Sequence, residues 1–130
     1  ILLVEDEPSL RKAISISLQT KNYEVLTATS SQEAINTLKS VKSVDAIWLD
    51  HYLLNNETGL DFLSQIKKHE DWKNVPVFVV SNSVDDKKVN SYYLMGIEKY
   101  YIKAENSLET IIDDIGSHFV KRGSTEVKNG

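Results

Sequence analysis

Short apolar runs alternate with stretches of helical periodicity along almost the whole chain. Several of the five runs are rich in Val and Ile, which is typical of strands buried on both faces of a sheet. The runs are Ile1–Val4, Tyr23–Leu26, Ala46–Leu49, Val77–Val80 and Tyr100–Ile102. We therefore expect five short, buried strands.

The stretches between the runs carry helix-start signals as well as apolar stripes. Pro8 suits the first turn of a helix, and Ser30 with Glu33 three residues later has the spacing of a capping box. Ser83 and Asp86 have the same spacing and predict a second cap. The sequence therefore predicts a helix after each strand.

This fivefold alternation predicts an α/β fold, a doubly wound three-layer sandwich with a parallel sheet and right-handed crossovers. In such folds ligands bind beyond the carboxyl ends of the strands. We assign residues 1–120 to one domain. The polar, aperiodic segment 121–130 is expected to be a tail or the start of a linker.

Composition narrows the class of protein. The absence of cysteine excludes disulfides and thiolate metal sites and favours a cytoplasmic location. No stretch approaches the roughly 20 apolar residues of a membrane-spanning helix. The net charge is −4, and Lys and Arg do not cluster. We therefore expect no membrane contact and no direct nucleic-acid contact by this segment.

Four of the five expected strands end beside residues of complementary chemistry. Glu5 and Asp6 follow the first strand, Asp50 the third, Ser81 the fourth and Lys103 the fifth. Each alone is more often a loop, turn or surface residue, and Asp50 alone is an even choice between a solvated and a reactive group. Gathered at one rim, the carboxylates would favour a hard divalent cation. A carboxylate beside such a cation can attack phosphorus, while a Lys and a hydroxyl cover the phosphoryl oxygens.

Four segments carry a family resemblance: "ILLVEDEP", "AIWLDHYL", "VFVVSNS" and "GIEKYYIKA". In this order and at these separations, they resemble the receiver domain of two-component response regulators over residues 1 to about 120. The resemblance implies a flavodoxin-like fold, with five helices around a five-stranded parallel sheet in the order 2-1-3-4-5. It also implies a phosphorelay signalling switch that catalyses only its own phosphorylation and dephosphorylation.

The resemblance implies a phosphoacceptor and its metal ligands. Asp50 would accept a phosphoryl group from a sensor histidine kinase or a histidine phosphotransfer protein. Asp6 and Asp50 would bind Mg²⁺ or Mn²⁺ directly. Glu5 would bind the cation through water, and Tyr52 would bind it through its backbone carbonyl.

The resemblance also implies how the signal leaves the site. Ser81 and Lys103 would each bind a phosphoryl oxygen, and Tyr100 stands where the family has its rotating switch aromatic. The change would pass to an effector protein or to an output domain, whose presence after residue 130 is left open. Tyr92 and Tyr93 suggest a homodimer or effector contact, although we expect at least one of them to be core.

Two departures from the family keep a second function open. Lys103 is followed by Ala104 instead of Pro, and the loop after Asp50 is one residue longer. They favour a phosphorylation-independent, receiver-like binding module, whereas the intact core positions favour the phosphoacceptor. A dehalogenase-like hydrolase is disfavoured, because Tyr52 stands where its general-acid Asp would be. A flavodoxin-type flavin site is disfavoured, because "EDEP" would repel a phosphate.

Two further positions carry weaker signals. His51 follows the acceptor, and strand alternation would turn its side chain away from that of Asp50, so we expect a surface or structural role. Arg11 and Ile16 are a candidate partner surface on the first helix, although a single exposed apolar residue is an ordinary finding.

Overall fold

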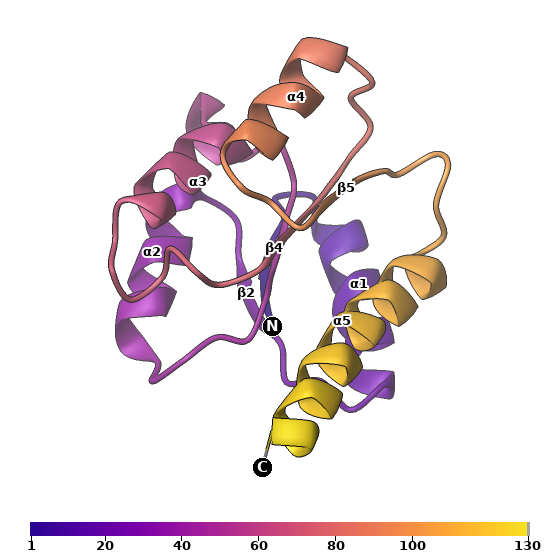
Figure 1. Ribbon diagram of the computed structural model, residues 1–130. Coiled ribbons are helices and arrows are strands. Elements are labelled where there is room, and N and C mark those ends of the chain that lie inside the picture. The colour runs from indigo at the N-terminus through magenta and orange to yellow at the C-terminus, as the bar shows by residue number, and fades with distance from the viewer. Residues whose placement is uncertain (130) are drawn as a thin grey trace.

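The computed structural model describes the backbone of residues 1–129 and the side chains of residues 1–120. Five parallel strands form one sheet in the order β2-β1-β3-β4-β5 (Figure 1). The strands are β1 (Leu2–Val4), β2 (Leu26–Ala28), β3 (Ile47–Leu49), β4 (Val77–Ser81) and β5 (Lys99–Ile102). The predicted doubly wound sheet and its strand order are confirmed.

Helices cover both faces of the sheet, as expected. They are α1 (Pro8–Thr20), α2 (Ser31–Ser40), α3 (Gly59–Lys67), α4 (Asp86–Leu94) and α5 (Leu108–Asn129), with a short 3₁₀ helix η1 (Leu54–Asn56) before α3. In Figure 1, α1 and α5 lie on one side of the sheet and α2 and α3 on the other. Side-chain packing places α4 with α2 and α3.

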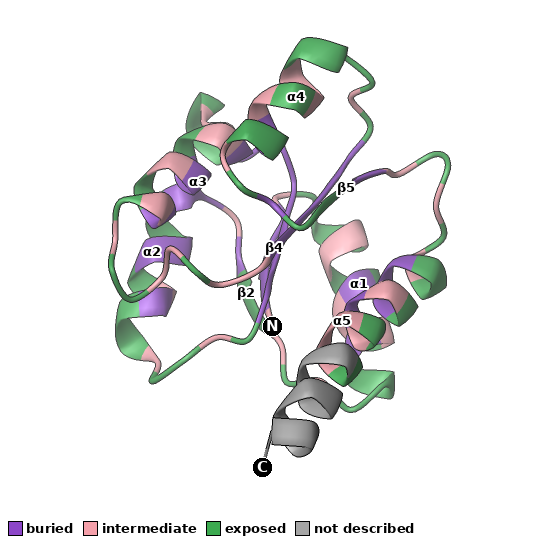
Figure 2. Ribbon diagram, in the orientation of Figure 1, coloured by how far each residue is buried: buried purple, intermediate pink, exposed green. Residues whose placement is uncertain are grey.

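The sheet separates two hydrophobic clusters because successive side chains along each strand point to opposite faces. Leu3 and Trp48 pack with α1 and α5, whereas Leu2, Ile47 and Leu49 pack with α2, α3 and α4. Every residue of β1 and β3 is buried, and Figure 2 shows the middle of the sheet as buried. The loops that follow these two strands therefore start from a fixed position in the core.

The second strand lies later in the chain than predicted. The expected run was Tyr23–Leu26, but the strand is Leu26–Ala28. The Tyr23 N–H donates to the carbonyl of Leu18 (3.1 Å), which completes the end of α1, and the Tyr23 ring packs beside Phe119. The apolar ring at position 23 therefore packs against α1 and α5 and does not belong to the sheet.

Two of the three predicted helix starts are confirmed and one is wrong, although only the Ser30 half of the predicted capping box forms. Pro8 opens α1, and the Ser30 hydroxyl accepts from the Glu33 N–H at the start of α2 (3.1 Å). The cap of α4 is Asp85, not Ser83, because the Asp85 carboxylate accepts from two N–H groups in the first turn. Ser83 instead uses its carbonyl to accept from the Tyr100 hydroxyl (3.0 Å).

For residues 121–129, at the end of the chain, the structure describes the backbone alone. The backbone of α5 runs to Asn129, and the expected tail or linker, 121–130, lies outside the residues whose side chains are described. That assignment stays a prediction. Within the described part of the chain, no helix combines the length and apolar character needed to cross a bilayer.

Candidate functional site

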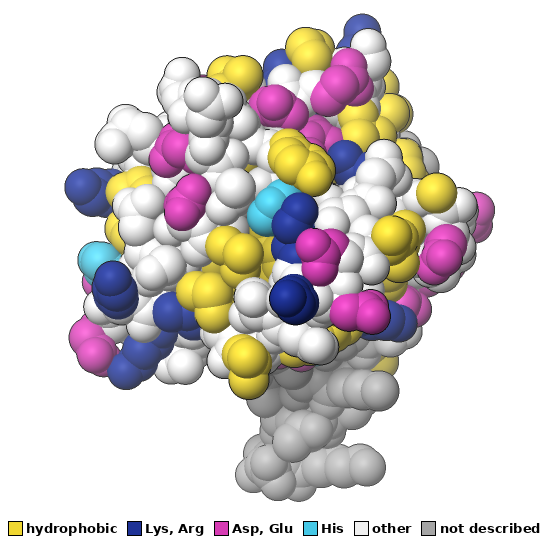
Figure 3. All heavy atoms as spheres, turned by 90° about the horizontal axis from the view of Figure 1, so that it is seen from above, with side chains coloured by type: hydrophobic (Ala, Val, Ile, Leu, Met, Phe, Trp, Pro, Cys, Tyr) yellow, Lys and Arg dark blue, Asp and Glu magenta, His cyan; other side chains and the backbone are white. Residues whose placement is uncertain are grey.

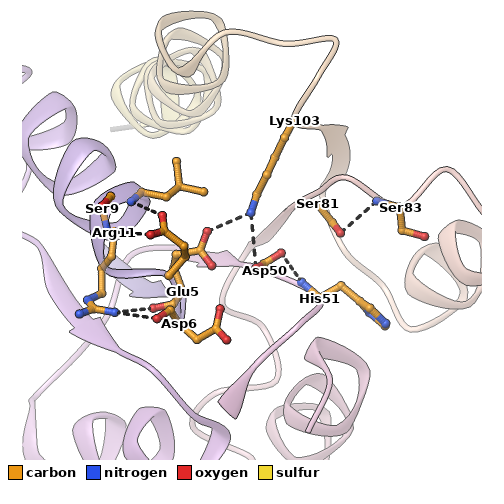
Figure 4. Close-up of polar contacts among 11 residues, drawn as sticks. Glu5, Asp6, Ser9, Arg11, Asp50, His51, Ser81, Ser83 and Lys103 are labelled. Atoms are coloured by element: carbon orange, nitrogen blue, oxygen red, sulfur yellow. Dashed lines mark hydrogen bonds and ion pairs between the residues drawn. The ribbon is translucent and has the colours of Figure 1, made fainter. Parts of the chain in front are cut away.

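Three of the predicted site residues meet in direct contact at the carboxyl ends of the strands. The Lys103 ammonium lies 2.9 Å from Glu5 Oε1 and 3.4 Å from Asp50 Oδ2 (Figure 4). Glu5 follows β1, Asp50 follows β3 and Lys103 follows β5, so parallel pairing brings distant parts of the chain to one edge. Figure 3 looks down on this edge, where acidic, basic and hydrophobic side chains are interspersed.

Burial makes these contacts electrostatically strong. Glu5 is 1% exposed and Asp50 5%, while the Lys103 side chain keeps 21% of its surface in solvent. Burial by itself would lower the pKa of Lys103, but the charges of Asp50 and Glu5 outweigh it and raise that pKa. Lys103 is therefore a permanent cation beside two carboxylates.

Glu5 is the most perturbed acid of the site. Burial first, and then the neighbouring Asp50, raise its pKa from the ordinary value of 4.5 to about 7, against the opposing effect of Lys103. Its Oε1 pairs with Lys103, but its Oε2 is buried without a hydrogen-bond partner among the described residues. A buried, unpartnered carboxylate oxygen is costly, so this position favours a further positive ligand.

The acidic cluster has the chemistry of a hard-cation site. One carboxylate oxygen each from Glu5, Asp6 and Asp50 lies within 4.8 Å of the other two. Hard divalent cations such as Mg²⁺ prefer oxygen ligands of this kind. The donor set and the unpartnered oxygen of Glu5 therefore fit such an ion. Tyr52 lies two residues beyond Asp50, where its backbone pairs with Thr58, and the role of its carbonyl stays a prediction.

Arg11 holds the loop that carries two of these acids. Its guanidinium donates to the backbone carbonyls of Glu5 (3.1 Å) and Asp6 (3.3 Å) (Figure 4). The sequence suggested Arg11 and Ile16 as a partner surface. Ile16 is exposed, whereas Arg11 is half-buried against the loop. No sequence motif signals such a contact, which depends on the angle at which α1 leaves the loop.

Asp50 itself is held on both carboxylate oxygens. Oδ2 faces Lys103, and Oδ1 accepts the backbone N–H of His51 (2.8 Å). The Asp50 N–H donates to the carbonyl of Val4 (3.0 Å), which extends the pairing of β3 with β1 by one residue. The carboxylate is thus fixed by the sheet, a cation and an amide, and is not a freely solvated loop group.

The predicted switch residues lie in the neighbouring strands β4 and β5. Ser81 is the fully buried last residue of β4, and its hydroxyl accepts the N–H of Ser83 (3.3 Å). Tyr100 is buried, and its hydroxyl donates to the Ser83 carbonyl (3.0 Å). Ser83 therefore connects the two predicted switch side chains. The Lys103–Ala104 peptide, whose geometry the sequence left open, is trans.

The sequence did not predict a contact between His51 and Tyr92. His51 is buried with its Nδ1 2.6 Å from the Tyr92 hydroxyl, and its ring points away from the acidic cluster (Figure 4). Burial, together with the charge of Lys88, lowers the pKa of His51. Tyr92 is core and Tyr93 is partly exposed, so the expectation that at least one of them is buried is confirmed.

A helix-start signal before α3 was also missed. The Thr58 hydroxyl accepts from the Asp61 N–H, and the Asp61 carboxylate accepts from the Thr58 N–H. The pattern Thr-x-x-Asp before an apolar run is a variant of the capping box and could have been found from the sequence. It fixes the start of α3 directly behind the acceptor loop.

Known proteins share both the sequence pattern and the fold. Residues 1–115 match the sequence profile of the response regulator receiver domain. The rice (Oryza sativa) two-component response regulator ORR3 is 29% identical over 103 residues, which cover 79% of this chain and 78% of ORR3. The chain is also 30% identical to the rice response regulator-like protein PRR37 over 83 residues, but these cover only 11% of PRR37 and 64% of this chain.

Solved structures agree. The phosphorylated cyanobacterial phytochrome response regulator RcpA superposes with a TM-score of 0.75 at 27% identity, covering 88% of this chain and 86% of RcpA. The Mn²⁺-bound form of the response regulator Rcp1 superposes with a TM-score of 0.78 at 24% identity, covering 91% of each chain. With the profile match over most of its length, this chain belongs to the response regulator receiver domain family.

Proposed function

We propose that Asp50 is the phosphoacceptor of a two-component phosphorelay. The observation that carries this proposal is the position of its carboxylate, between the Lys103 ammonium and the His51 N–H at the end of a buried strand. A nucleophile held in this way loses little freedom on reacting, and most of the work in phosphoryl transfer is positioning and charge neutralisation.

Transfer of the phosphoryl group to Asp50 requires no proton donor from this chain. An Asp50 carboxylate oxygen forms a bond to the phosphorus of a phosphohistidine on a sensor kinase or phosphotransfer protein. The phosphorus–nitrogen bond breaks, and its electron pair returns to the imidazole nitrogen. Lys103 would pair with one phosphoryl oxygen of the resulting acyl phosphate, and its 3.4 Å distance from Asp50 Oδ2 supports this role.

Asp6 and Asp50 would bind a divalent cation directly, with Glu5 contributing through water and Tyr52 through its backbone carbonyl. A bound Mg²⁺ or Mn²⁺ would supply charge neutralisation for the phosphoryl oxygens. The clustered carboxylate oxygens and the unpartnered Oε2 of Glu5 support this assignment. The Mn²⁺ in the similarly folded Rcp1 is in keeping with it.

The switch would use the contacts of Ser83. The Ser81 hydroxyl accepts a hydrogen bond from the Ser83 N–H. If this hydroxyl turns toward a phosphoryl oxygen, that hydrogen bond breaks. Movement of Ser83 then alters the acceptor of the Tyr100 hydroxyl. Phosphorylation would in this way bias an equilibrium between two arrangements. An output domain or effector protein would read it, and the exposed Tyr93 is a candidate for effector or homodimer contact.

One observation favours a second candidate, a phosphorylation-independent binding module. Lys103 lies closer to Glu5 (2.9 Å) than to Asp50 (3.4 Å), so its charge already has a buried partner without any phosphoryl group. In that case the Lys103–Glu5 ion pair would stabilise the fold and would have no part in binding a phosphoryl group.

Beryllofluoride with Mg²⁺, which mimics a phosphoryl group on a carboxylate, separates the two functions. Binding can be followed by Trp48 fluorescence in a Trp72→Phe background, since Trp48 lies two residues before Asp50 in β3. The phosphoacceptor reading expects saturable binding that Asp50→Asn abolishes. Absence of any response to beryllofluoride and millimolar Mg²⁺ in the folded protein would favour the binding module.

A further inference from the structure

Helix α4 is attached to the core through the buried Tyr92, and to β5 through the Tyr93 hydroxyl, which accepts the Tyr100 N–H (3.0 Å). Among its residues, Asp86–Leu94, only Tyr92 is buried, and its ring is 0% exposed in the cluster beneath α2 and α3. Val89 packs against the same cluster but is only partly buried. The position of α4 therefore depends strongly on what holds Tyr92.

The tyrosine hydroxyl is held by the residue next to the acceptor. Tyr92 Oη and His51 Nδ1 lie 2.6 Å apart and share a hydrogen bond, and His51 is 4% exposed. The rings meet edge to face, with centroids 5.7 Å apart. Both side chains are buried, so the loss of either partner costs the other a hydrogen bond that water cannot easily replace.

The backbone of His51 also contacts the acceptor itself. Its N–H donates to Asp50 Oδ1 (2.8 Å), and its carbonyl accepts the N–H of Gly59 at the start of α3 (2.7 Å). His51 thus joins the acceptor carboxylate, the first residue of α3 and the anchor of α4. A shift of its backbone is transmitted to both helices.

Packing leaves little room to absorb such a shift. A Cβ at Gly59 would lie 2.5 Å from the Tyr92 hydroxyl oxygen and 2.7 Å from the carbonyl oxygen of Asp50. The three segments therefore meet where only a glycine fits. Close-packed interiors pass displacements on, since they contain few voids into which a group can move.

We propose that the His51–Tyr92 hydrogen bond couples the state of Asp50 to helix α4. This coupling rests on Asp50 being the phosphoacceptor. When an Asp50 oxygen bonds to phosphorus, the carboxylate loses its full charge, and the bond from the His51 N–H weakens or re-aims. The displacement of His51 reaches α4 through Tyr92. This route starts at the His51 N–H, whereas the other starts at the Ser81 hydroxyl. The two routes meet where the Tyr92 and Tyr100 rings are in contact, with centroids 5.7 Å apart. Because coupling is reciprocal, a partner bound to α4 changes the affinity of the acceptor site by the same factor.

The test measures backbone amide hydrogen exchange with and without beryllofluoride and Mg²⁺. The variants are Tyr92→Phe, His51→Phe and the double substitution. The matched control is Tyr101→Phe, which also removes a hydroxyl from a buried tyrosine, but one that donates to Asp114 on the opposite face of the sheet.

In the wild type and in Tyr101→Phe, we expect beryllofluoride to change exchange in α4 by about two- to tenfold, the range that one net hydrogen bond corresponds to. Tyr92→Phe should still bind the probe and keep the response at residues 82–84, but lose most of the response in α4. His51→Phe, measured at saturating probe, should lose the α4 response in the same way. The double variant should match the single ones, as expected of a pair that acts as a unit. The double variant removes both partners of the hydrogen bond, so neither is left buried without the other. It can therefore be used for the test if a single variant unfolds.

Each contrary result has a distinct meaning. An α4 response that persists in a probe-bound Tyr92→Phe or in the double variant overturns the coupling and leaves the phosphoacceptor standing. A wild type that binds the probe without any change in α4 does the same. A folded wild type that does not bind the probe overturns the coupling together with the proposed function.

Discussion

A methyl group at Gly59 tests how tightly the acceptor strand, α3 and α4 are packed together. The alanine Cβ would lie 2.5 Å from the Tyr92 hydroxyl oxygen and 2.7 Å from the Asp50 carbonyl oxygen, and 3.2 Å from Leu49. Tyr92 is fully buried and the Asp50 oxygen belongs to the backbone, so neither can yield without moving its element. Gly59→Ala must therefore displace either α4 or the acceptor.

The size of the effect follows from two opposing contributions. Overpacking a core costs about 1–3 kcal/mol. Replacing Gly by Ala contributes at most about 1 kcal/mol of helix propensity in a helix interior, and Gly59 is only the first residue of α3. We expect Gly59→Ala to lower the free energy of unfolding by about 1–2 kcal/mol. A displaced Asp50 should also weaken binding of beryllofluoride.

Urea denaturation followed by circular dichroism measures this loss. The matched control is Gly116→Ala in α5, where the added Cβ would meet only the Tyr23 hydroxyl, at 3.2 Å. That variant should be as stable as the wild type or more stable by up to about 1 kcal/mol. In a Tyr92→Phe background the cost at Gly59 should shrink but persist, because the Asp50 carbonyl remains. A Gly59→Ala protein as stable as Gly116→Ala would refute the close packing.

Three other predictions concern the charged cluster. Because the pKa of Glu5 rises from 4.5 to about 7 on folding, the folded state holds this proton more tightly than the unfolded state. As the pH rises from 4.5 to 7, the free energy of unfolding of the metal-free wild type should therefore fall by roughly 3 kcal/mol relative to that of Glu5→Gln. If urea denaturation gave the same pH dependence for the two proteins, this would be contradicted. Lys103→Gln should weaken beryllofluoride binding at least about tenfold through loss of a charged hydrogen bond, whereas affinity within twofold of wild type would exclude the assigned role. Arg11→Ala should weaken Mg²⁺ binding by about tenfold or more, as loss of a supporting contact does, while the exposed neighbour Lys12→Ala should not; equal Mg²⁺ titrations of the two variants would show that Arg11 does not support the site.

The alternation of apolar runs was enough to predict a parallel sheet, and the strand order implied by the family resemblance brought Glu5, Asp50 and Lys103 together. Parallel strands end at one edge, so the order of the strands places those residues together whatever the loops do. The predicted position of the second strand was wrong because Tyr23, the first residue of the apolar run, packs on α1 and α5 and not in the sheet. Apolar character favours burial of a residue but does not indicate which element covers it.

The contacts beyond the strand ends could not be predicted in this way. The pairing of Lys103 with Glu5 depends on the reach of a glutamate side chain at that position. The contact of His51 with Tyr92 depends on how α4 crosses the acceptor loop, and these residues are 41 positions apart. Neither distance follows from local periodicity, since both are set by the packing of loops and helices on the finished sheet.

The central claim is that Asp50 accepts a phosphoryl group. Intact-mass spectrometry of the chain after incubation with Mg²⁺ and a small acyl phosphate, such as acetyl phosphate, tests it directly. We expect the wild type to gain the mass of one phosphoryl group, and Asp50→Asn, folded by circular dichroism, to gain none. A folded wild type that gains no mass, or an Asp50→Asn variant that gains as much as the wild type, would contradict the claim.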